Sequence, residues 1–156
     1  MARSVVVLAL ALLYCGCSTV ASNGSTRSEE APHFFPSEDA ALRSLPFSEV
    51  VQVGDVLYLS GQIGLAPGTL DLVPGGIAAE AAQTLDLVRG ILERRGATMD
   101  DVFKCTVFLA DIAEWPAFNE VYRQYFDAPY PARSALAASG LALGARVEVE
   151  CLADAP

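Results

Sequence analysis

The sequence predicts a single α+β domain in which one mixed sheet carries two helices on one face. Three observations lead to this prediction. Short apolar and β-branched runs alternate with two segments of helical periodicity, glycines and prolines separate them at regular intervals, and 156 residues are one domain's worth of chain. The expected order of elements is ββαβαββ, and the sequence shows no internal repeat.

The first two strands are expected to form a β-hairpin. Residues 47–53 are apolar and β-branched, and residues 56–60 form a second run of the same kind. Gly54 and Asp55 separate the two runs. Two turn residues of which the first is glycine are typical of a hairpin between such runs.

Helical spacing marks two later segments. Over residues 78–95 the apolar residues Leu85, Val88 and Leu92 recur at helical intervals, and Gly96 follows as a left-handed cap. A second helix is expected over residues 114–126, with Asp111 as its N-cap. Pro116 is tolerated in its first turn, and its buried face is expected to carry Phe118, Tyr122 and Tyr125.

Three further strands complete the pattern. Residues 102–109 form the strand between the two helices, and residues 133–138 and 146–152 form the last two, joined through Gly140 and Gly144.

The first residues are expected to form a targeting signal. Arg3 gives a short basic region, and residues 5–14 are an unbroken apolar run that is too short to span a bilayer as a helix. We therefore assign residues 1–17 to a signal peptide and residues 18–41, which begin with a stretch rich in Ser, Asn, Gly and Thr, to a flexible tether. The globular domain is expected over residues 42–156.

The end of this signal resembles a bacterial lipobox. Cys17 follows the small residue Gly16 that such a site needs, although Tyr14 stands where an aliphatic residue is usual. Lipidation at Cys17 is the preferred interpretation, and simple secretion and lipidation at Cys15 are the alternatives. A mis-assigned start in front of a cytosolic protein is disfavoured by the polar stretch that follows. The protein is thus expected to be exported, either periplasmic or attached to a membrane through a lipid alone.

The charge restricts the partners of the domain. The formal net charge is −9 and Lys104 is the only lysine, so neither nucleic acid nor anionic lipid head groups are expected to bind. An anionic substrate has to be held by a local cation, because the overall field repels it. Each arginine in a cleft is therefore of interest.

Several conventional catalytic sets are missing from the expected domain. The only histidine, His33, falls in the expected tether, which leaves no Ser-His-Asp or Cys-His set in residues 42–156. No CxxC pair or histidine cluster suggests zinc, and the glycine-rich loops lack the spacing of a nucleotide site, so neither a metal nor a cofactor is expected. Arg133, Ser60, several carboxylates and backbone groups remain.

Five blocks of sequence now carry a resemblance. They are PFS with VGDVLYLSGQI at residues 46–63, DVFKCTVFL at 101–109, FNEVY at 118–122, PARS at 131–134 and VEVE at 147–150. In this order they resemble the reactive-intermediate deaminase (Rid, or YjgF-type) family over residues 46–153. The resemblance implies a chorismate-mutase-like α+β fold and a homotrimer with active sites in the clefts between subunits. It also implies hydrolysis of small enamine or imine carboxylates, such as 2-aminoacrylate, to a keto acid and ammonia.

The resemblance also assigns roles to residues. Arg133 matches the family's carboxylate clamp, and a planar guanidinium binds a carboxylate through two parallel hydrogen bonds. Glu148 matches the carboxylate that positions the attacking water, and Glu150 lies on the same strand face. The other expected substrate contacts are Ser60, Gly61, Phe47, Asn119 and Ala135.

Two positions depart from the family pattern. Phe47 stands where tyrosine is most frequent, which removes a donor near the substrate that is worth about 1.5–3 kcal/mol. Ala135 stands where deaminating relatives often have cysteine, but there the family uses mainly backbone atoms. Three function classes therefore stay open: an imine deaminase, which is favoured, a non-catalytic module that holds a small carboxylate in the trimer cleft, and a structural surface protein. Release of ammonia and keto acid from a freshly made imine would identify the first.

Two cysteines belong to the domain. Period-two alternation places Cys105 and Cys151 on apolar strand faces that look toward the helices. A disulfide requires neighbouring strands, and directly paired positions often strain it, whereas cysteine is also a good small core residue. We therefore predict two free, buried thiols.

Overall fold

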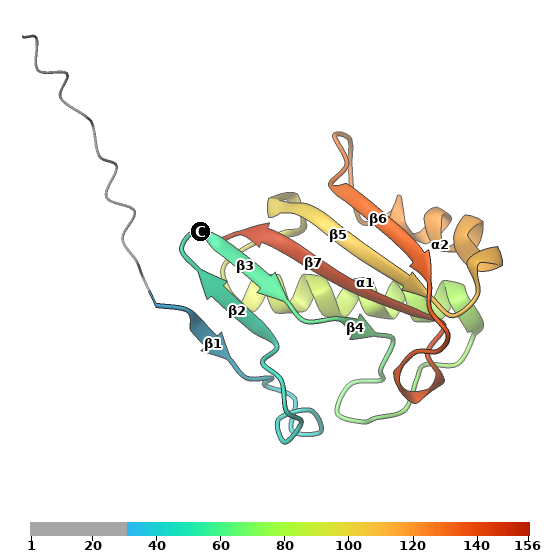
Figure 1. Cartoon of the computed structure of the whole chain (residues 1–156), viewed down its shortest axis with the longest axis horizontal. Helices are drawn as coiled ribbons and strands as arrows, with labels where there is room; N and C mark the ends of the chain where they lie inside the picture. The colour runs from blue at the N-terminus through green and yellow to red at the C-terminus, as the bar shows by residue number, and fades with distance from the viewer. Residues whose placement is uncertain (1–30) are drawn as a thin grey trace, which may run out of the picture.

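The computed structural model describes residues 31–156, so the expected signal segment with Cys15 and Cys17 lies outside the described residues. Within residues 31–156 the chain forms a seven-stranded mixed sheet and two α-helices. Figure 1 shows how these elements are arranged. The strands are β1 (His33–Phe35), β2 (Val50–Val53), β3 (Val56–Leu59), β4 (Gln62–Ile63), β5 (Val102–Leu109), β6 (Ala132–Ala137) and β7 (Val147–Asp154). The helices are α1 (Gly76–Arg94) and α2 (Trp115–Tyr122). The predicted α+β class is confirmed, and β1 and β4 extend the predicted order.

The C-terminal strand lies in the middle of the sheet. The strand order is β1-β2-β3-β7-β5-β6, and the short β4 also pairs with β7. The β5–β6 pair is parallel, and the other pairs are antiparallel. β7 therefore joins the N-terminal hairpin to the strands that follow α1, and β6 is left as an edge strand beside α2.

The predicted hairpin is present. Val53 pairs with Val56 at its end, and Gly54 adopts a φ of 57°, a left-handed conformation that glycine adopts at little cost. The predicted strand over residues 102–109 matches β5 in both bounds.

The two helices cover one face of the sheet and enclose a single core with it. α1 buries Leu85, Val88 and Leu92 as its periodicity predicts, and Gly96 follows it with a φ of 79°. α2 ends at Tyr122, four residues earlier than predicted. Tyr125 nevertheless ties this end of the fold to α1, because its hydroxyl hydrogen-bonds to the Ala82 carbonyl at 3.0 Å and an Asp86 carboxylate oxygen at 2.8 Å.

Asp111 caps a shorter element than expected. Its carboxylate accepts a hydrogen bond from the Ala113 amide at 2.9 Å, in a single 3-10 turn (Ile112–Glu114) that leads into α2. The side chain of Asp111 therefore caps the turn before α2, whereas the N-cap of α2 itself is Glu114.

The expected tether over residues 18–41 is wrong for its last part. His33–Phe35 forms β1 and pairs with β2, and the Phe35 ring lies 4.4 Å from the guanidinium carbon of Arg95. Ser37 is buried and donates a hydrogen bond to Glu49 at 2.9 Å. The aromatic pair Phe34-Phe35 marks the return of apolar sequence, which the polar composition just before it obscured.

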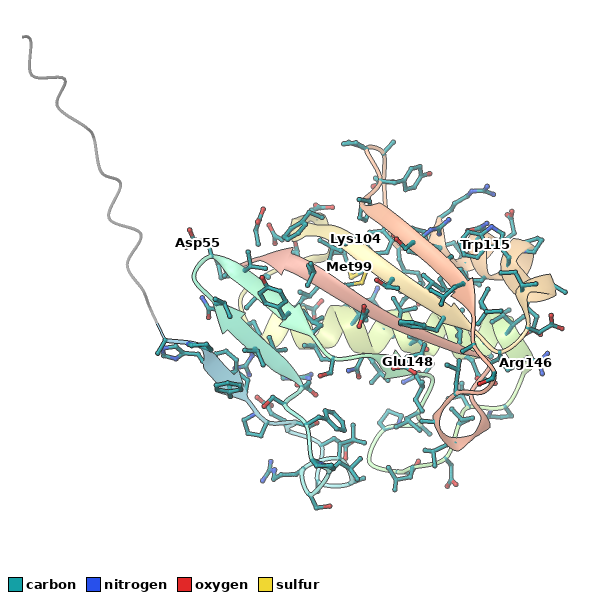
Figure 2. The ribbon with its side chains drawn as sticks, viewed as in Figure 1. Asp55, Met99, Lys104, Trp115, Arg146 and Glu148 are labelled. Carbon is teal, nitrogen blue, oxygen red and sulfur yellow. A yellow bond between two sulfur atoms is a disulfide. The ribbon has the colours of Figure 1, made fainter. Side chains whose placement is uncertain are left out.

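The prediction of two free thiols is also wrong. Cys105 on β5 and Cys151 on β7 form a disulfide, drawn as a yellow bond in Figure 2. The two residues are direct register partners on neighbouring antiparallel strands, and both side chains are fully buried on the face toward the helices. Their separation of 46 residues in sequence hides this pairing until the sheet order is known.

As for the membrane, no helix in residues 31–156 combines the length and the apolar character that crossing a bilayer requires.

Candidate active site

Arg133 lies on the edge strand β6 and faces α2. It is the register partner of Cys105, so its side chain projects to the same face of the sheet as the buried disulfide. Its guanidinium carbon Cζ lies 4.5 Å from the ring centroid of Trp115 and 4.4 Å from that of Tyr122. Both distances are within the range of favourable cation–π contacts.

A cleft of about 300 Å³ opens beside this arginine. It is lined by Asn119, Tyr122, Arg123, Tyr130, Pro131 and Arg133. Asn119 comes from α2, one turn before Arg123, so the structure brings the two predicted residues Asn119 and Arg133 together. Ala135, two residues after Arg133 on β6, is half-buried on the same face of the strand.

The guanidinium of Arg133 has no hydrogen bond or ion pair within residues 31–156. The other arginines in this part of the chain all bind oxygen atoms. Arg43 donates to the carbonyls of Ser37 and Glu38, and carboxylates pair with Arg89, Arg94, Arg95, Arg123 and Arg146. The donors of Arg133 are thus left for another carboxylate.

Tyr122 stays neutral beside this cation. Only 3% of the residue is exposed, and burial raises the pKa of its hydroxyl to about 12 although the nearby Arg133 charge acts to lower it. The ring can therefore contact the guanidinium without forming an ion pair with it.

Glu148 lies in a second group of predicted residues, on β7 (Figure 2). Its carboxylate packs directly over Gly61, because a Cβ atom built on that glycine would collide with Glu148 Oε1. A side chain at position 61 would therefore displace the carboxylate from this place. The structure therefore brings the two predicted residues Gly61 and Glu148 together.

Ser60 and Phe47 belong to the same region. The Ser60 hydroxyl donates to the Ser48 carbonyl at 2.6 Å, and the Ser60 amide donates to the Glu49 carbonyl at 3.0 Å. These bonds hold residues 47–49 against the segment that carries Ser60 and Gly61. Phe47 is 43% exposed at the start of this segment, so its ring is available to a ligand or to another chain.

The buried carboxylate of Glu49 anchors residues 47–49 to two other parts of the fold. Glu49 is only 6% exposed, and its carboxylate accepts a hydrogen bond from Ser37 at 2.9 Å and one from Arg94 at 2.9 Å. Each carboxylate oxygen thus has one partner, which satisfies the requirement for burying a charge.

The electrostatics of this region favour a proton acceptor. Burial raises the pKa of the Glu148 carboxyl above its ordinary value, and the charge of Glu150 on the same face raises it further. A carboxylate with a raised pKa is a stronger base and accepts a proton from water more readily. Glu148 is therefore suited to general-base chemistry.

The two groups of residues lie on opposite faces of the sheet. Arg133 is in register with Cys105, whereas Glu148 is in register with Phe108, three residues further along β5. Because side chains alternate along a strand, this odd separation directs Arg133 and Glu148 to opposite faces. A single chain does not unite the two predicted catalytic residues. Within residues 31–156, no group of three or more His, Cys, Asp or Glu side chains is placed to hold a metal.

Sequence reasoning missed the aromatic surroundings of Arg133. The sequence alone assigns no role to Trp115, and it predicts only a core position for Tyr122. The available signal is the spacing of aromatic residues at 115, 118 and 122, which places three rings on one face of a helix. That spacing alone does not indicate which strand lies beside the helix.

Comparisons with known proteins agree with this architecture. A goat (Capra hircus) protein named 2-iminobutanoate/2-iminopropanoate deaminase is 44% identical over 108 residues, which cover 69% of this chain and 79% of that protein. The crystal structure of RidA from an Antarctic Psychrobacter bacterium is 33% identical with a TM-score of 0.72, and the match covers 78% of this chain and 98% of that one. The YjgF gene product of E. coli is 31% identical with a TM-score of 0.71 at the same coverage.

A family model described as Endoribonuclease L-PSP matches residues 38–155, nearly the whole of the described chain. Together with these relatives, the match shows that the chain belongs to the Rid (YjgF-type) family.

Proposed function

We propose that this protein is a deaminase that hydrolyses the imines of small 2-oxo acids, the class to which 2-iminobutanoate and 2-iminopropanoate belong. The observation that carries the proposal is the state of Arg133, a half-buried cation beside a cleft. The N–H donors of its guanidinium have no partner in residues 31–156. A guanidinium in this state is suited to bidentate binding of a carboxylate. The names of the relatives support the reaction type.

The reaction consumes one water for each imine. The carboxylate of the substrate binds Arg133, and Glu148 accepts a proton from the water as its oxygen bonds to the imine carbon. As this bond forms, the carbon–nitrogen double bond becomes single and the proton held by Glu148 passes to the nitrogen, which gives a carbinolamine. The carbinolamine then becomes a carbonyl when Glu148 transfers its hydroxyl proton to the nitrogen and the carbon–nitrogen bond breaks. The products are a 2-oxo acid and ammonia. Ser60, Gly61, Phe47, Asn119 and Ala135 complete the proposed pocket.

The proposal requires more than one chain. Because Arg133 and Glu148 lie on opposite faces of the sheet, we infer that a cleft between two copies joins Arg133 of one to Glu148 of the next. A closed ring of three copies, as the family resemblance implies, would contain three such clefts.

The test is a complementation experiment with two variants, Arg133→Ala and Glu148→Gln. Imines are made in situ by an amino acid oxidase, and formation of 2-oxo acid above the spontaneous rate is measured. Each variant alone should be inactive. When the two variants are co-expressed in equal amounts, about one quarter of the clefts should combine an intact Arg133 with an intact Glu148. Such a cleft takes its Arg133 from a Glu148→Gln chain and its Glu148 from an Arg133→Ala chain, and each choice occurs in about half of the clefts. Mixed assemblies without activity would rule out the shared cleft, and an inactive wild type would rule out the deaminase.

Ribonuclease activity, which the description of the family model suggests, is not supported by the electrostatics of this chain. Proteins that bind RNA neutralise its phosphates with clusters of Lys and Arg. Here the net charge is −9, and five of the described arginines are paired with carboxylates.

We also propose that the protein is exported and anchored through a lipid on Cys17. The support comes from the sequence: Arg3, the apolar run over residues 5–14 and the small residue before Cys17. In that compartment the substrates would be imines released by oxidation of amines or amino acids outside the cytoplasm. Metabolic labelling with a fatty acid analogue, compared between wild type and Cys17→Ser, tests the anchor.

A further inference from the structure

Three aromatic rings of α2 lie close to the guanidinium of Arg133. The ring centroids of Trp115 and Tyr122 lie 4.5 and 4.4 Å from its Cζ atom, and that of Phe118 lies at 6.0 Å. The rings also contact one another, with centroids 6.2 Å apart for Trp115 and Phe118 and 5.7 Å apart for Phe118 and Tyr122. The rings therefore form one continuous aromatic row on the helix.

The guanidinium contacts the first and the last ring of this row at once. Trp115 and Tyr122 are seven residues apart, so they share one face of α2, and their Cα atoms are separated by about 10 Å along the helix axis. The Cζ atom of Arg133 nevertheless lies within 4.5 Å of both ring centroids. Contact with two rings limits the rotation of a long side chain that would otherwise be free.

Rings hold an arginine differently from carboxylates. An acidic partner occupies the N–H donors and neutralises the charge, as it does for Arg94 and Arg146 in this chain. A cation–π contact supplies no oxygen acceptor, so the N–H donors of the guanidinium stay available to another group. Arg133 is the described arginine that combines ring contacts with no oxygen partner in residues 31–156.

We propose that Trp115 and Tyr122 are positioning residues that hold the Arg133 guanidinium by contact with both rings and leave its N–H donors free for the substrate carboxylate. The inference rests on the proposed clamp role of Arg133. It goes further because it assigns the orientation of the clamp to two side chains that need not touch the substrate themselves.

Trp115 is the better residue to test. Tyr122 is almost fully buried in the core, so a large change there would disturb the fold, whereas Trp115 is only partly buried and packs at the edge of the core. Trp115 is also the only tryptophan in the sequence. Its fluorescence therefore reports on the surroundings of Arg133 without any added label.

The first measurement is a fluorescence titration of the wild-type chain. Butanoate serves as the probe, and the uncharged butanamide, which has nearly the same shape, serves as the control. Butanoate should change the Trp115 emission in a saturable way and butanamide should not. A butanoate response that survives in Arg133→Ala would refute the clamp itself, and with it the proposed function.

The second measurement separates positioning from a merely structural role. In Trp115→Leu, calorimetry should show butanoate affinity weakened about five- to tenfold, a value between those of an exposed and of a fully desolvated cation–π contact. KM for the imine should rise by a similar factor while kcat changes less than twofold. Trp115→Phe should restore most of the affinity, because a ring is again present. Tyr122→Phe, which keeps its ring and loses only the hydroxyl, should bind butanoate within twofold of wild type.

Two results would overturn the positioning role while leaving the clamp intact. One is unchanged butanoate affinity in Trp115→Leu together with lost affinity in Arg133→Ala. The other is a Trp115→Leu effect that persists undiminished in the Arg133→Ala background, since a double-mutant cycle should then show no coupling. If Trp115→Leu fails to fold, the Phe variants and the wild-type titration decide the question.

Discussion

Arg133 and Glu148 project from opposite faces of one sheet, three positions apart in the register of β5. The residues proposed for substrate binding and for proton transfer therefore lie on two surfaces that substitutions can disturb separately. The variants of these two residues should differ in which kinetic constant they change, and the first two predictions use this difference.

Replacing Arg133 should remove binding of the carboxylate. Hydrogen bonds to a charged group are worth about 1.5–3 kcal/mol each, so Arg133→Ala should raise the Kd for butanoate at least tenfold. Arg133→Lys keeps the charge but not the planar pair of donors, so its Kd for butanoate should lie between those of the wild type and Arg133→Ala. Calorimetric titration measures both. Arg89→Ala, which removes an arginine exposed and paired with Asp86, is the control and should bind normally.

Replacing Glu148 should slow the reaction and spare binding. Glu148→Gln keeps the size of the side chain and removes the proton acceptor, so kcat should fall about 100-fold or more, as is typical for loss of a general base. The Kd for butanoate should stay within twofold of the wild-type value, since the carboxylate is proposed to bind Arg133 and not Glu148. A variant that raises only KM would contradict the role in activating water. Glu93→Gln on the exposed face of α1 is the matched control.

The pH dependence should respond to Glu150. Glu148 acts as a base only when deprotonated, so kcat/KM should rise with pH through its pKa, which burial and then Glu150 raise above the ordinary value. Glu150→Gln removes the repulsive charge and lowers the pKa of Glu148. The acidic limb of the pH profile should therefore shift to lower pH. A shift to higher pH, or the same shift in Glu93→Gln, would show that Glu150 does not act on Glu148.

The Cys105–Cys151 disulfide should stabilise the fold. A link between residues 46 positions apart restricts the unfolded chain, and reduction should lower the free energy of unfolding by about 2–4 kcal/mol. Denaturant titration with and without reductant measures the difference. The double variant Cys105→Ala, Cys151→Ala should show the reduced stability and no response of this size to reductant. Peptide mapping without reduction should recover the two cysteines in one linked fragment, and their recovery as separate thiols would refute the disulfide.

Local signals in the sequence predict local structure well in this protein. The turn at Gly54-Asp55, the cap at Gly96 and the apolar run of β5 each act within a few residues, and the structure confirms all three. β1 escaped prediction because three residues are too few to show a period, and its strand character depends on pairing with β2.

Long-range relationships account for what the sequence does not predict. The disulfide follows from the adjacency of β5 and β7, and the contacts of Arg133 follow from the adjacency of β6 and α2. Family resemblance supplies residue roles, but it does not state which face of the sheet each side chain takes. The division of Arg133 and Glu148 between two faces emerges only from the register.

The buried carboxylate of Glu49 has a practical consequence for shortening the chain. Its two oxygens are divided between Ser37, close to where the described fold begins, and Arg94 at the end of α1. A truncation that starts at residue 38, where the family match begins, would delete Ser37 and leave one buried oxygen without its donor. An unsatisfied buried group of this kind costs about 1–3 kcal/mol. Since Glu49 follows Ser48, whose carbonyl binds the Ser60 hydroxyl, such a trimmed protein would be altered at its pocket as well as at its end.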